Sequence, residues 1–213
     1  MPHKNAHQSV IRVADARGFV VEGDGDRYVI TAAHCLQKRP NDGQDWEPYL
    51  PPTMSYSYTE ERTYPKLLGS LGSQPTVWAE CLFVDPVADI AVLGKPDDQE
   101  LGERAEEYVS LVEEAKPVKM RSCRERKESG WLFALDAQHW FRCKVSGTRK
   151  TWLWEAEEPI RGGMSGSPIL AADGKVIAVC CTSNGSEDTE THTEGGPNPG
   201  LVNLPGWLVE ELT

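Results

Sequence analysis

Residues 28–35 read Tyr-Val-Ile-Thr-Ala-Ala-His-Cys, an apolar and β-branched run that ends at His34. Such a run predicts a buried β-strand that presents the histidine at its end. Two later stretches have a related form: Asp89 stands at the start of an apolar run, and Ser165 lies among glycines just before another. Glycines around a serine predict a tight turn with accessible backbone N–H groups. The sequence therefore places three chemically active side chains at strand ends.

These three residue types are the parts that acyl transfer by serine requires. The hydroxyl needs a base to take its proton, a carboxylate to orient that base, and N–H donors for the oxyanion. We expect His34 to be the base, Asp89 its orienting carboxylate and Ser165 the nucleophile. The N–H groups of Gly163 and Ser165 are the expected oxyanion hole. Asp85 is the alternative carboxylate, although the proline that follows it indicates a turn.

The order of the three residues distinguishes between two hydrolase folds. Histidine, then aspartate, then serine is the order of the chymotrypsin-type template. An α/β-hydrolase would carry the order serine, acid, histidine and the motif Gly-x-Ser-x-Gly. Here the position two residues after Ser165 is Ser167, and no alternation of strands and helices is present. The α/β-hydrolase interpretation is therefore excluded on both counts.

The rest of the chain reads mainly as short strands separated by turns. About six strands in each half, joined by turns, predict an all-β fold of two antiparallel six-stranded β-barrels. The first set spans residues 10–14, 18–22, 27–33, 67–71, 77–84 and 89–93, and the second spans 130–135, 140–145, 151–155, 167–170, 175–182 and 199–202.

Two segments have a helical pattern instead. Residues 99–114 carry apolar side chains at helical spacing among many acids, which predicts one amphipathic helix at the inter-barrel connection. Its acidic residues are expected to form a solvated face rather than a binding patch. Residues 205–212 predict a short helix docked at the carboxyl terminus.

Two further segments read as long loops, and they complete the division of the chain. Residues 37–64 are polar and proline-rich, and residues 183–199 are rich in glycine, threonine and acids. We expect one peptidase-sized domain over residues 1–213. The first barrel would take residues 8–96, a connecting segment with the helix 97–118, and the second barrel with the terminal helix 119–213.

Composition limits the class of partner. The 213 residues include 22 Lys and Arg against 33 Asp and Glu, a net charge of −11. This excess of acid argues against nucleic acid or an anionic membrane as the main partner and leaves a protein or peptide substrate. No apolar run approaches the roughly 20 residues that cross a bilayer, and the first residues show no export signal. We expect a cytoplasmic protein, whose oligomeric state the sequence leaves open.

The cysteines predict free thiols rather than bridges or a metal site. They are scattered through apolar stretches, and the chain is long enough to fold without disulfides. No Cys-x-x-Cys is present, and adjacent cysteines on a strand point to opposite faces, so zinc is not expected. We expect no metal and no cofactor. The six are Cys35, Cys81, Cys123, Cys143, Cys180 and Cys181.

With its motifs in this order, the chain resembles the trypsin-like serine peptidases of the chymotrypsin (PA clan) fold. The likeness is greatest to bacterial and HtrA-type peptidase domains. The motifs that carry it are Thr31–Cys35, Asp89–Leu93 and Gly163–Pro168, with a weaker match at Asn198–Val202. The resemblance spans nearly the whole chain. It implies a serine endopeptidase that works through an acyl-enzyme, with the triad and oxyanion hole in the roles given above.

The chain departs from the family pattern in three places. Ser167 stands where the family more often has glycine, and no cysteine precedes Cys35 to pair with it as in secreted relatives. The third departure is the lack of a basic residue followed by Ile-Val-Gly-Gly, the usual zymogen cleavage signal. We therefore expect a site that forms without a newly freed amino terminus, in an HtrA-like branch without a PDZ domain.

The specificity pocket is the least determined part of the site. Carried over from the family, its base falls at residues 158–160 and contributes Ile160. Its walls are Thr182, Ser183, Asn184 and Gly200. No aspartate stands where cleavage after Lys or Arg would need one, so small or medium apolar P1 residues are favoured. The alternative is that Glu158 and the acids of residues 187–194 attract a basic substrate.

Two other functions remain open beside the endopeptidase. One is a catalytically silent or partner-activated binding module that keeps the peptidase fold; the complete set of catalytic residues argues against it. The other is an esterase acting on small acyl esters. The lack of a zymogen signal also suggests either narrow substrate choice or an activating partner.

Overall fold

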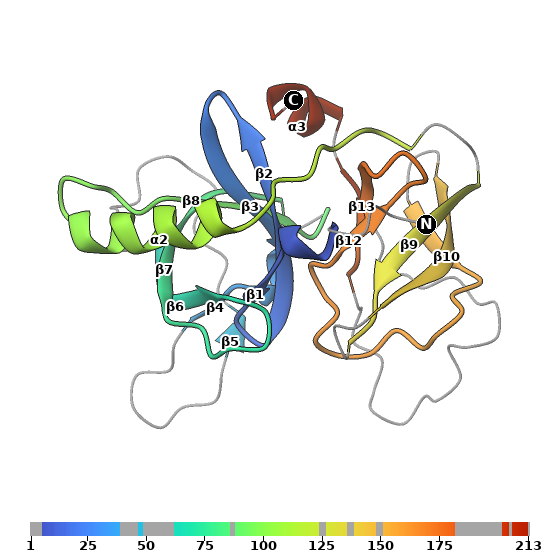
Figure 1. Ribbon diagram of the computed structural model, residues 1–213, viewed down its shortest axis with the longest axis horizontal. Coiled ribbons are helices and arrows are strands. Elements are labelled where there is room, and N and C mark those ends of the chain that lie inside the picture. Colours follow the sequence, from blue (N-terminus) through green and yellow to red (C-terminus); the bar gives the residue numbers. More distant parts are fainter. Residues whose placement is uncertain are drawn as a thin grey trace.

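The computed structural model describes residues 6–38, 47–48, 62–85, 88–123, 127–135, 139–147, 151–181, 202–204 and 206–212. Within these residues the protein is built mainly of antiparallel strands, in two groups that lie side by side (Figure 1). A first hydrophobic core fills one group and a second fills the other.

The first group is a closed barrel, as the sequence predicts. Its strands pair in the order β1-β2-β3-β8-β7-β6. The barrel is closed by the pairing of β1 with β6. The six strands are β1 (Val10–Val13), β2 (Ala16–Gly23), β3 (Asp26–Ala32), β6 (Thr63–Gly69), β7 (Val77–Asp85) and β8 (Ile90–Gly94).

Local sequence explains the tightest connection of the barrel. β2 and β3 are joined by Asp24 and Gly25, whose φ values of +50° and +83° are both left-handed. Two such residues form a type I′ turn, which matches the twist of a hairpin and favours the pair Asp-Gly. β6 starts earlier than the predicted strand 67–71, and its pairing with β7 shifts register after Tyr64. Pro65 cannot donate to the ladder and Lys66 has a φ of +52°, which accounts for the irregularity.

The second group is a six-stranded antiparallel sheet in the order β11-β10-β9-β12-β13-β14. Each predicted strand of this half has a counterpart, although β13 and β14 are shorter than expected. A closed second barrel is not formed by the pairings among the described residues, whereas the first closes. The strands are β9 (Glu128–Phe133), β10 (Trp140–Gly147), β11 (Thr151–Trp154), β12 (Pro168–Leu170), β13 (Val176–Val179) and β14 (Val202–Asn203).

The remaining short elements are η1 (Ala6–Ser9), η2 (Ala33–Cys35) and the two-stranded pair β4 (Gln37–Lys38) and β5 (Glu47–Pro48). Both strands of this pair and the first residues of β6 fall in the stretch 37–64 expected to be a loop. The predicted loop 183–199 lies outside the described residues.

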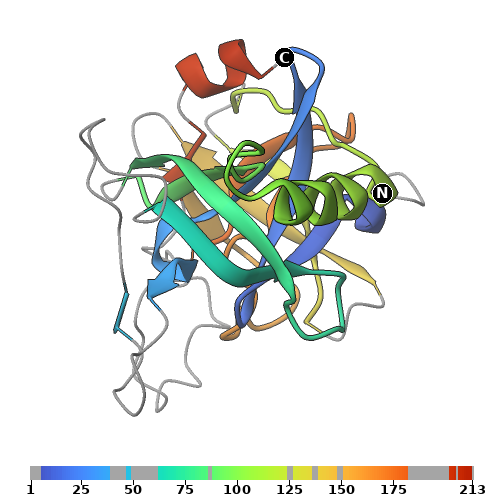
Figure 2. The ribbon, with the colours of Figure 1, turned by 90° about the vertical axis from the view of Figure 1, so that its left-hand side faces the viewer.

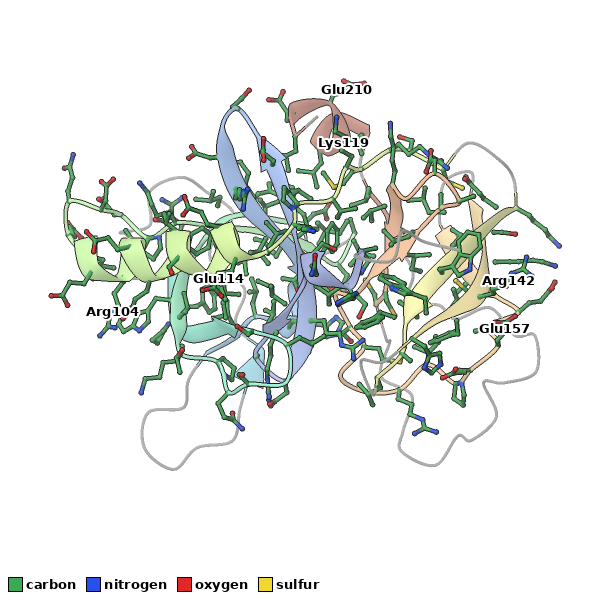
Figure 3. All side chains as sticks on the ribbon, in the orientation of Figure 1. Arg104, Glu114, Lys119, Arg142, Glu157 and Glu210 are labelled. Carbon is green, nitrogen blue, oxygen red and sulfur yellow. The ribbon has the colours of Figure 1, made fainter. Side chains whose placement is uncertain are left out.

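The predicted amphipathic helix is α2 (Gly102–Glu114), and it lies along the outer face of the barrel (Figures 1 and 2). Its apolar stripe of Ala105, Tyr108, Leu111 and Val112 is buried, while its acids face solvent. Figure 3 shows the charged side chains of Arg104 and Glu114 projecting from this helix. The helix follows the barrel in the chain, as expected for the connecting segment, but it packs against the barrel rather than against the second sheet.

The terminal helix α3 (Gly206–Glu211) returns to the barrel after the last strand of the sheet. A Cβ atom added at Gly23, the end of β2, would lie only 2.9 Å from Leu212 Cδ2. Figure 1 shows the helix beside the tip of β2. The end of the chain therefore holds barrel and sheet together. No helix among the described residues is both long and apolar enough to span a membrane.

The packing of α2 yields a test of the barrel's stability. The buried hydroxyl of Tyr108 lies 3.0 Å from the carbonyl oxygen of Arg27 and 3.1 Å from that of Leu93. Tyr108→Phe would leave these buried acceptors without that donor, so we expect a loss of about 1–2 kcal/mol in the free energy of unfolding. Urea denaturation measures it. Tyr28→Phe, at a half-buried tyrosine of β3, is the matched control, and an equal loss in both variants would contradict this account.

Candidate active site

The closed barrel brings His34 and Asp89 together. His34 lies in η2, directly after β3, and Asp89 directly precedes β8. These two strands are neighbours, and Ala32 at the end of β3 pairs with Ile90 at the start of β8. Because antiparallel neighbours place the end of one strand beside the start of the other, the two residues must meet.

Asp89 holds the His34 turn by three hydrogen bonds. Its Oδ2 lies 2.7 Å from Nδ1 of the imidazole, and its Oδ1 accepts a hydrogen bond of 2.9 Å from the backbone N–H of His34. Its own carbonyl oxygen accepts a third, of 3.0 Å, from the N–H of Ala33. The two carboxylate oxygens fix the ring and the backbone that carries it. The tautomer with hydrogen on Nδ1 follows, and Nε2 is directed away from the carboxylate.

The backbone at Asp89 is strained in a way that this residue type tolerates. Its φ of +53° is left-handed, a region in which aspartate and asparagine are enriched several-fold among non-glycine residues. This conformation aims the carboxylate back across the barrel end at η2. Asp85, the alternative carboxylate, has its Oδ1 2.9 Å from the N–H of Ala88, where it closes the turn before β8.

Ser165 lies in a turn that is also held by its own backbone. Met164 N–H donates to Arg161 O at 3.2 Å, and Ser167 N–H donates to Met164 O at 3.1 Å. Gly166 N–H donates to the carbonyl oxygen of Cys180, at the end of β13, at 2.6 Å. The turn is thus fastened to the second sheet. Both Ser165 and Ser167 are buried.

The same turn packs against the barrel, close to the strand that leads to His34. Arg17 N–H donates to Ser165 O at 2.9 Å, and Thr31 Oγ1 donates to Arg17 O at 2.7 Å. A Cβ atom at Gly166 would lie 1.9 Å from Arg17 O and 2.5 Å from Thr31 Oγ1, so only glycine allows this approach. Thr31 lies in β3, three residues before His34, which follows the strand in η2. The junction of barrel and sheet therefore packs the serine turn against the strand that leads to the histidine.

Gly163 takes up the conformation expected of an oxyanion-hole turn. Its φ of +86° is left-handed, and a single residue, Met164, separates it from Ser165. Among the described residues its N–H donates no hydrogen bond. Gly163 and Ser165 remain the expected donors of an oxyanion hole.

The environment of His34 raises its affinity for a proton. Burial of the imidazole would lower the pKa, but hydrogen bonds with Asp89 and with the Cys35 thiol outweigh burial and raise the pKa of His34 from 6.5 to about 10. The fold adds a thiol on the other side: Cys181 Sγ lies 3.7 Å from the carbonyl oxygen of Asp89. Burial, with the negative charge of Asp89, raises the pKa of Cys181, so this thiol stays protonated.

Of the residues expected to form the specificity pocket, the structure describes only those at its base, residues 158–160. Ile160 is half-buried and packs against the core of the second sheet. The segment before it is joined to β10: Glu157 N–H donates to Arg142 O at 2.9 Å, and Arg142 N–H donates to the Glu157 carboxylate at 2.8 Å. Figure 3 shows both residues at the outer side of this sheet. Glu158 forms an ion pair with His139. Thr182, Ser183, Asn184 and Gly200 lie outside the described residues.

Three residues that contribute contacts to this region were not expected from the sequence. Cys35 hydrogen-bonds the imidazole, Cys181 reaches Asp89, and Arg17 holds the serine turn. For Arg17 a signal existed, since a charged residue interrupts the otherwise apolar stretch 16–21. For Cys35 and Cys181 the sequence offers no signal beyond the apolar residues around them. All six cysteines are free thiols, and no group of His, Cys, Asp and Glu in the described part of the chain could hold a metal ion.

Comparisons with known proteins identify the family and the fold. A family model described as a trypsin-like peptidase domain matches residues 16–179. The serine protease domain of the Sesbania mosaic virus polyprotein superposes with a TM-score of 0.54 at 13% identity, covering 97% of this chain and 92% of that one. The MamO protease domain of Magnetospirillum magneticum gives 0.51 at 13% identity, covering 99% of each. At these identities the likeness shows the fold alone. A search of curated proteins finds none that matches the sequence.

The raised pKa of His34 can be measured directly. We expect NMR titration of the His34 ring to show a pKa well above 6.5, and Asp89→Asn to move it down towards that value. The raised pKa also makes the stability of the fold depend on pH. Because the pKa in the folded protein exceeds the unfolded value, protonated His34 stabilises the fold fully below about pH 6.5, and this contribution is lost as pH rises through the folded pKa. A wild-type titration near 6.5 would contradict the arrangement described.

Proposed function

We propose, from the premise that this chain belongs to the trypsin-like peptidase domain family, that it is a serine endopeptidase with His34, Asp89 and Ser165 as its triad. The observation that carries the proposal is the pair of hydrogen bonds that one carboxylate accepts from the ring and the backbone N–H of one histidine. Such a carboxylate holds the imidazole in the tautomer and orientation that a general base for serine requires. Asp89 has this geometry with His34, whereas Asp85 closes a turn.

The proposed reaction proceeds in two halves. In the first, His34 Nε2 takes the proton of Ser165 Oγ as that oxygen attacks the scissile carbonyl carbon. The carbonyl oxygen becomes an oxyanion that accepts hydrogen bonds from the N–H groups of Gly163 and Ser165. The intermediate collapses, the C–N bond breaks, and the imidazolium gives its proton to the leaving amine. In the second half, water attacks the acyl-serine ester in the same way and releases the acid.

The environment of His34 would set the pH at which this chemistry runs. A general base must be neutral, while the hydrogen bonds of Asp89 and Cys35 favour the imidazolium and raise the pKa of His34 to about 10. The neutral fraction therefore grows with pH up to that pKa. We infer a peptidase whose activity increases on the alkaline side of neutrality.

The finer features of the family belong to the same proposal. We infer that the second sheet is the second barrel, because its edge strands β11 and β14 lie within contact distance of each other. Ile160 would contribute apolar surface to a pocket for a small or medium P1 side chain, with Thr182, Ser183, Asn184 and Gly200 as its walls. The partner is then a protein or peptide substrate, and the six free thiols agree with a cytoplasmic location.

Removal of the nucleophile is the first test. We expect Ser165→Ala to abolish peptide hydrolysis, because the variant lacks the hydroxyl on which the acyl-enzyme would form. Digestion of a peptide library, analysed by mass spectrometry, measures the loss and reports the P1 preference of the wild type. A fluorophosphonate should label Ser165 in the wild type only. Unimpaired proteolysis by the variant would refute the assignment.

The choice of carboxylate has its own test. Replacing Asp89 by Asn should lower kcat on the order of 10⁴-fold, the loss that this change causes in the chymotrypsin-type template. Asp85→Asn is the matched control, since it makes the same chemical change four residues away, and we expect it to alter kcat by less than about tenfold. Initial rates with one peptide substrate decide between them. If Asp85→Asn alone has the large effect, the triad has been assigned to the wrong residue.

A further inference from the structure

Arg17 is a charged residue in an interior position. It lies in β2, and only 3% of its surface is exposed. Burial of a guanidinium is costly unless hydrogen bonds and nearby polar groups replace its water. Its N–H groups donate hydrogen bonds across the junction between the barrel and the second sheet. Nη1 donates to Phe133 O at 2.8 Å, and Nη2 donates to Ala134 O and Leu135 O, both at 2.9 Å.

These acceptors belong to the other half of the molecule. Phe133 ends β9, the next two residues follow it directly, and the Phe133 ring lies under the guanidinium at 5.7 Å from its carbon. One side chain from the barrel thus holds three successive carbonyl groups of the second sheet. The planar guanidinium, with its five N–H donors in a fixed fork, suits such a fan of acceptors, and a lysine ammonium does not.

The backbone of the same residue holds the serine turn. Arg17 N–H donates to Ser165 O, and Arg17 O lies where any side chain on Gly166 would clash. Arg17 therefore contacts the serine turn through its main chain and the second sheet through its side chain. A movement of the Arg17 main chain or side chain would change where the residues around Ser165 lie.

The last residue that the Arg17 side chain holds also lies beside Gly163. A Cβ atom placed on Gly163 would lie 3.3 Å from Leu135 Cδ1 and 3.3 Å from Asp15 O. Gly163 is thus flanked on one side by the segment that the guanidinium fixes. It is also flanked by Asp15, which lies two positions before Arg17 in the chain. The Leu135 side of Gly163 is therefore the side that the arginine holds by a hydrogen bond.

We propose that Arg17 is a positioning residue that sets the N–H groups of Gly163 and Ser165 relative to His34, an inference that rests on the proposed peptidase function. An oxyanion hole acts on charge that develops in the transition state, so its misplacement lowers kcat and leaves substrate binding largely unchanged. Arg17→Lys keeps the charge but cannot reach three carbonyls in a fan. It should lower kcat about 10- to 100-fold, less than the about 10²–10³-fold lost when an oxyanion donor is removed outright.

Arg27 offers a matched control in the same chain. Its Nη1 also lies within hydrogen-bond distance of three backbone carbonyls, those of Val112, Glu113 and Ala115 at the end of α2. Arg27→Lys makes the same chemical change at the outer side of the barrel, remote from the serine turn. It therefore reports what the loss of three carbonyl contacts does to the fold alone.

The experiment compares wild type, Arg17→Lys and Arg27→Lys with one peptide substrate. We expect the first variant to lose kcat with KM within about twofold, and the second to keep both within about twofold. Fluorophosphonate labelling of Ser165 should slow in parallel with kcat. Equal kcat in the two variants, or a change in KM alone, would overturn the proposal. If Arg17→Lys does not fold, Arg17→Gln, which retains an amide donor, takes its place.

Amide hydrogen exchange gives a readout that needs no turnover. We expect Arg17→Lys to speed exchange in the peptide that spans residues 163–167, and Arg27→Lys to speed it only at the end of α2. Unchanged exchange at 163–167 would overturn the positioning role even in an active enzyme. If the wild type neither cleaves peptides nor reacts with the phosphonate while this exchange pattern holds, the peptidase function fails and the positioning of the turn stands.

Discussion

The carboxylate of Asp89 is the contact on which the rest of the site depends. It joins the start of β8 to the turn after β3 through the imidazole and the backbone N–H of His34. The two residues meet because β3 and β8 are antiparallel neighbours in the barrel. The left-handed φ of Asp89 is part of the same constraint, since it aims the carboxylate at the histidine. The pairing of β3 with β8 thus positions the imidazole.

The second constraint is the junction between barrel and sheet. The serine turn belongs to the sheet through Gly166 and Cys180, and to the barrel through Arg17 and Thr31. The histidine and the serine therefore come from the barrel and the sheet respectively, and the proposed reaction depends on how these two parts are positioned. A buried arginine at that junction, hydrogen-bonded to three carbonyls of the sheet, fixes the position more strictly than apolar packing alone would.

Much of this was visible in the sequence, for physical reasons that differ by element. The hairpin turn at Asp24 and Gly25 and the helix of residues 102–114 follow from local rules, and both formed close to their expected bounds. The apolar run of residues 28–33 predicts its strand in the same way. The contacts of Arg17 could not be predicted, because its acceptors are backbone carbonyls more than a hundred positions away, which leave no pattern in the sequence. The contact between Cys35 and the imidazole depends on side-chain orientation in a single turn, which the sequence pattern does not determine.

A crystal structure of the wild-type protein with a peptidyl boronic acid tests the central claim most directly. The account predicts a covalent bond from Ser165 Oγ to boron, with one boronate oxygen about 2.7–3.1 Å from the N–H groups of Gly163 and Ser165. His34 would remain hydrogen-bonded to Asp89 and direct its Nε2 at the adduct. A boronate bound without a bond to Ser165, or with its oxygen turned away from Gly163, would contradict it.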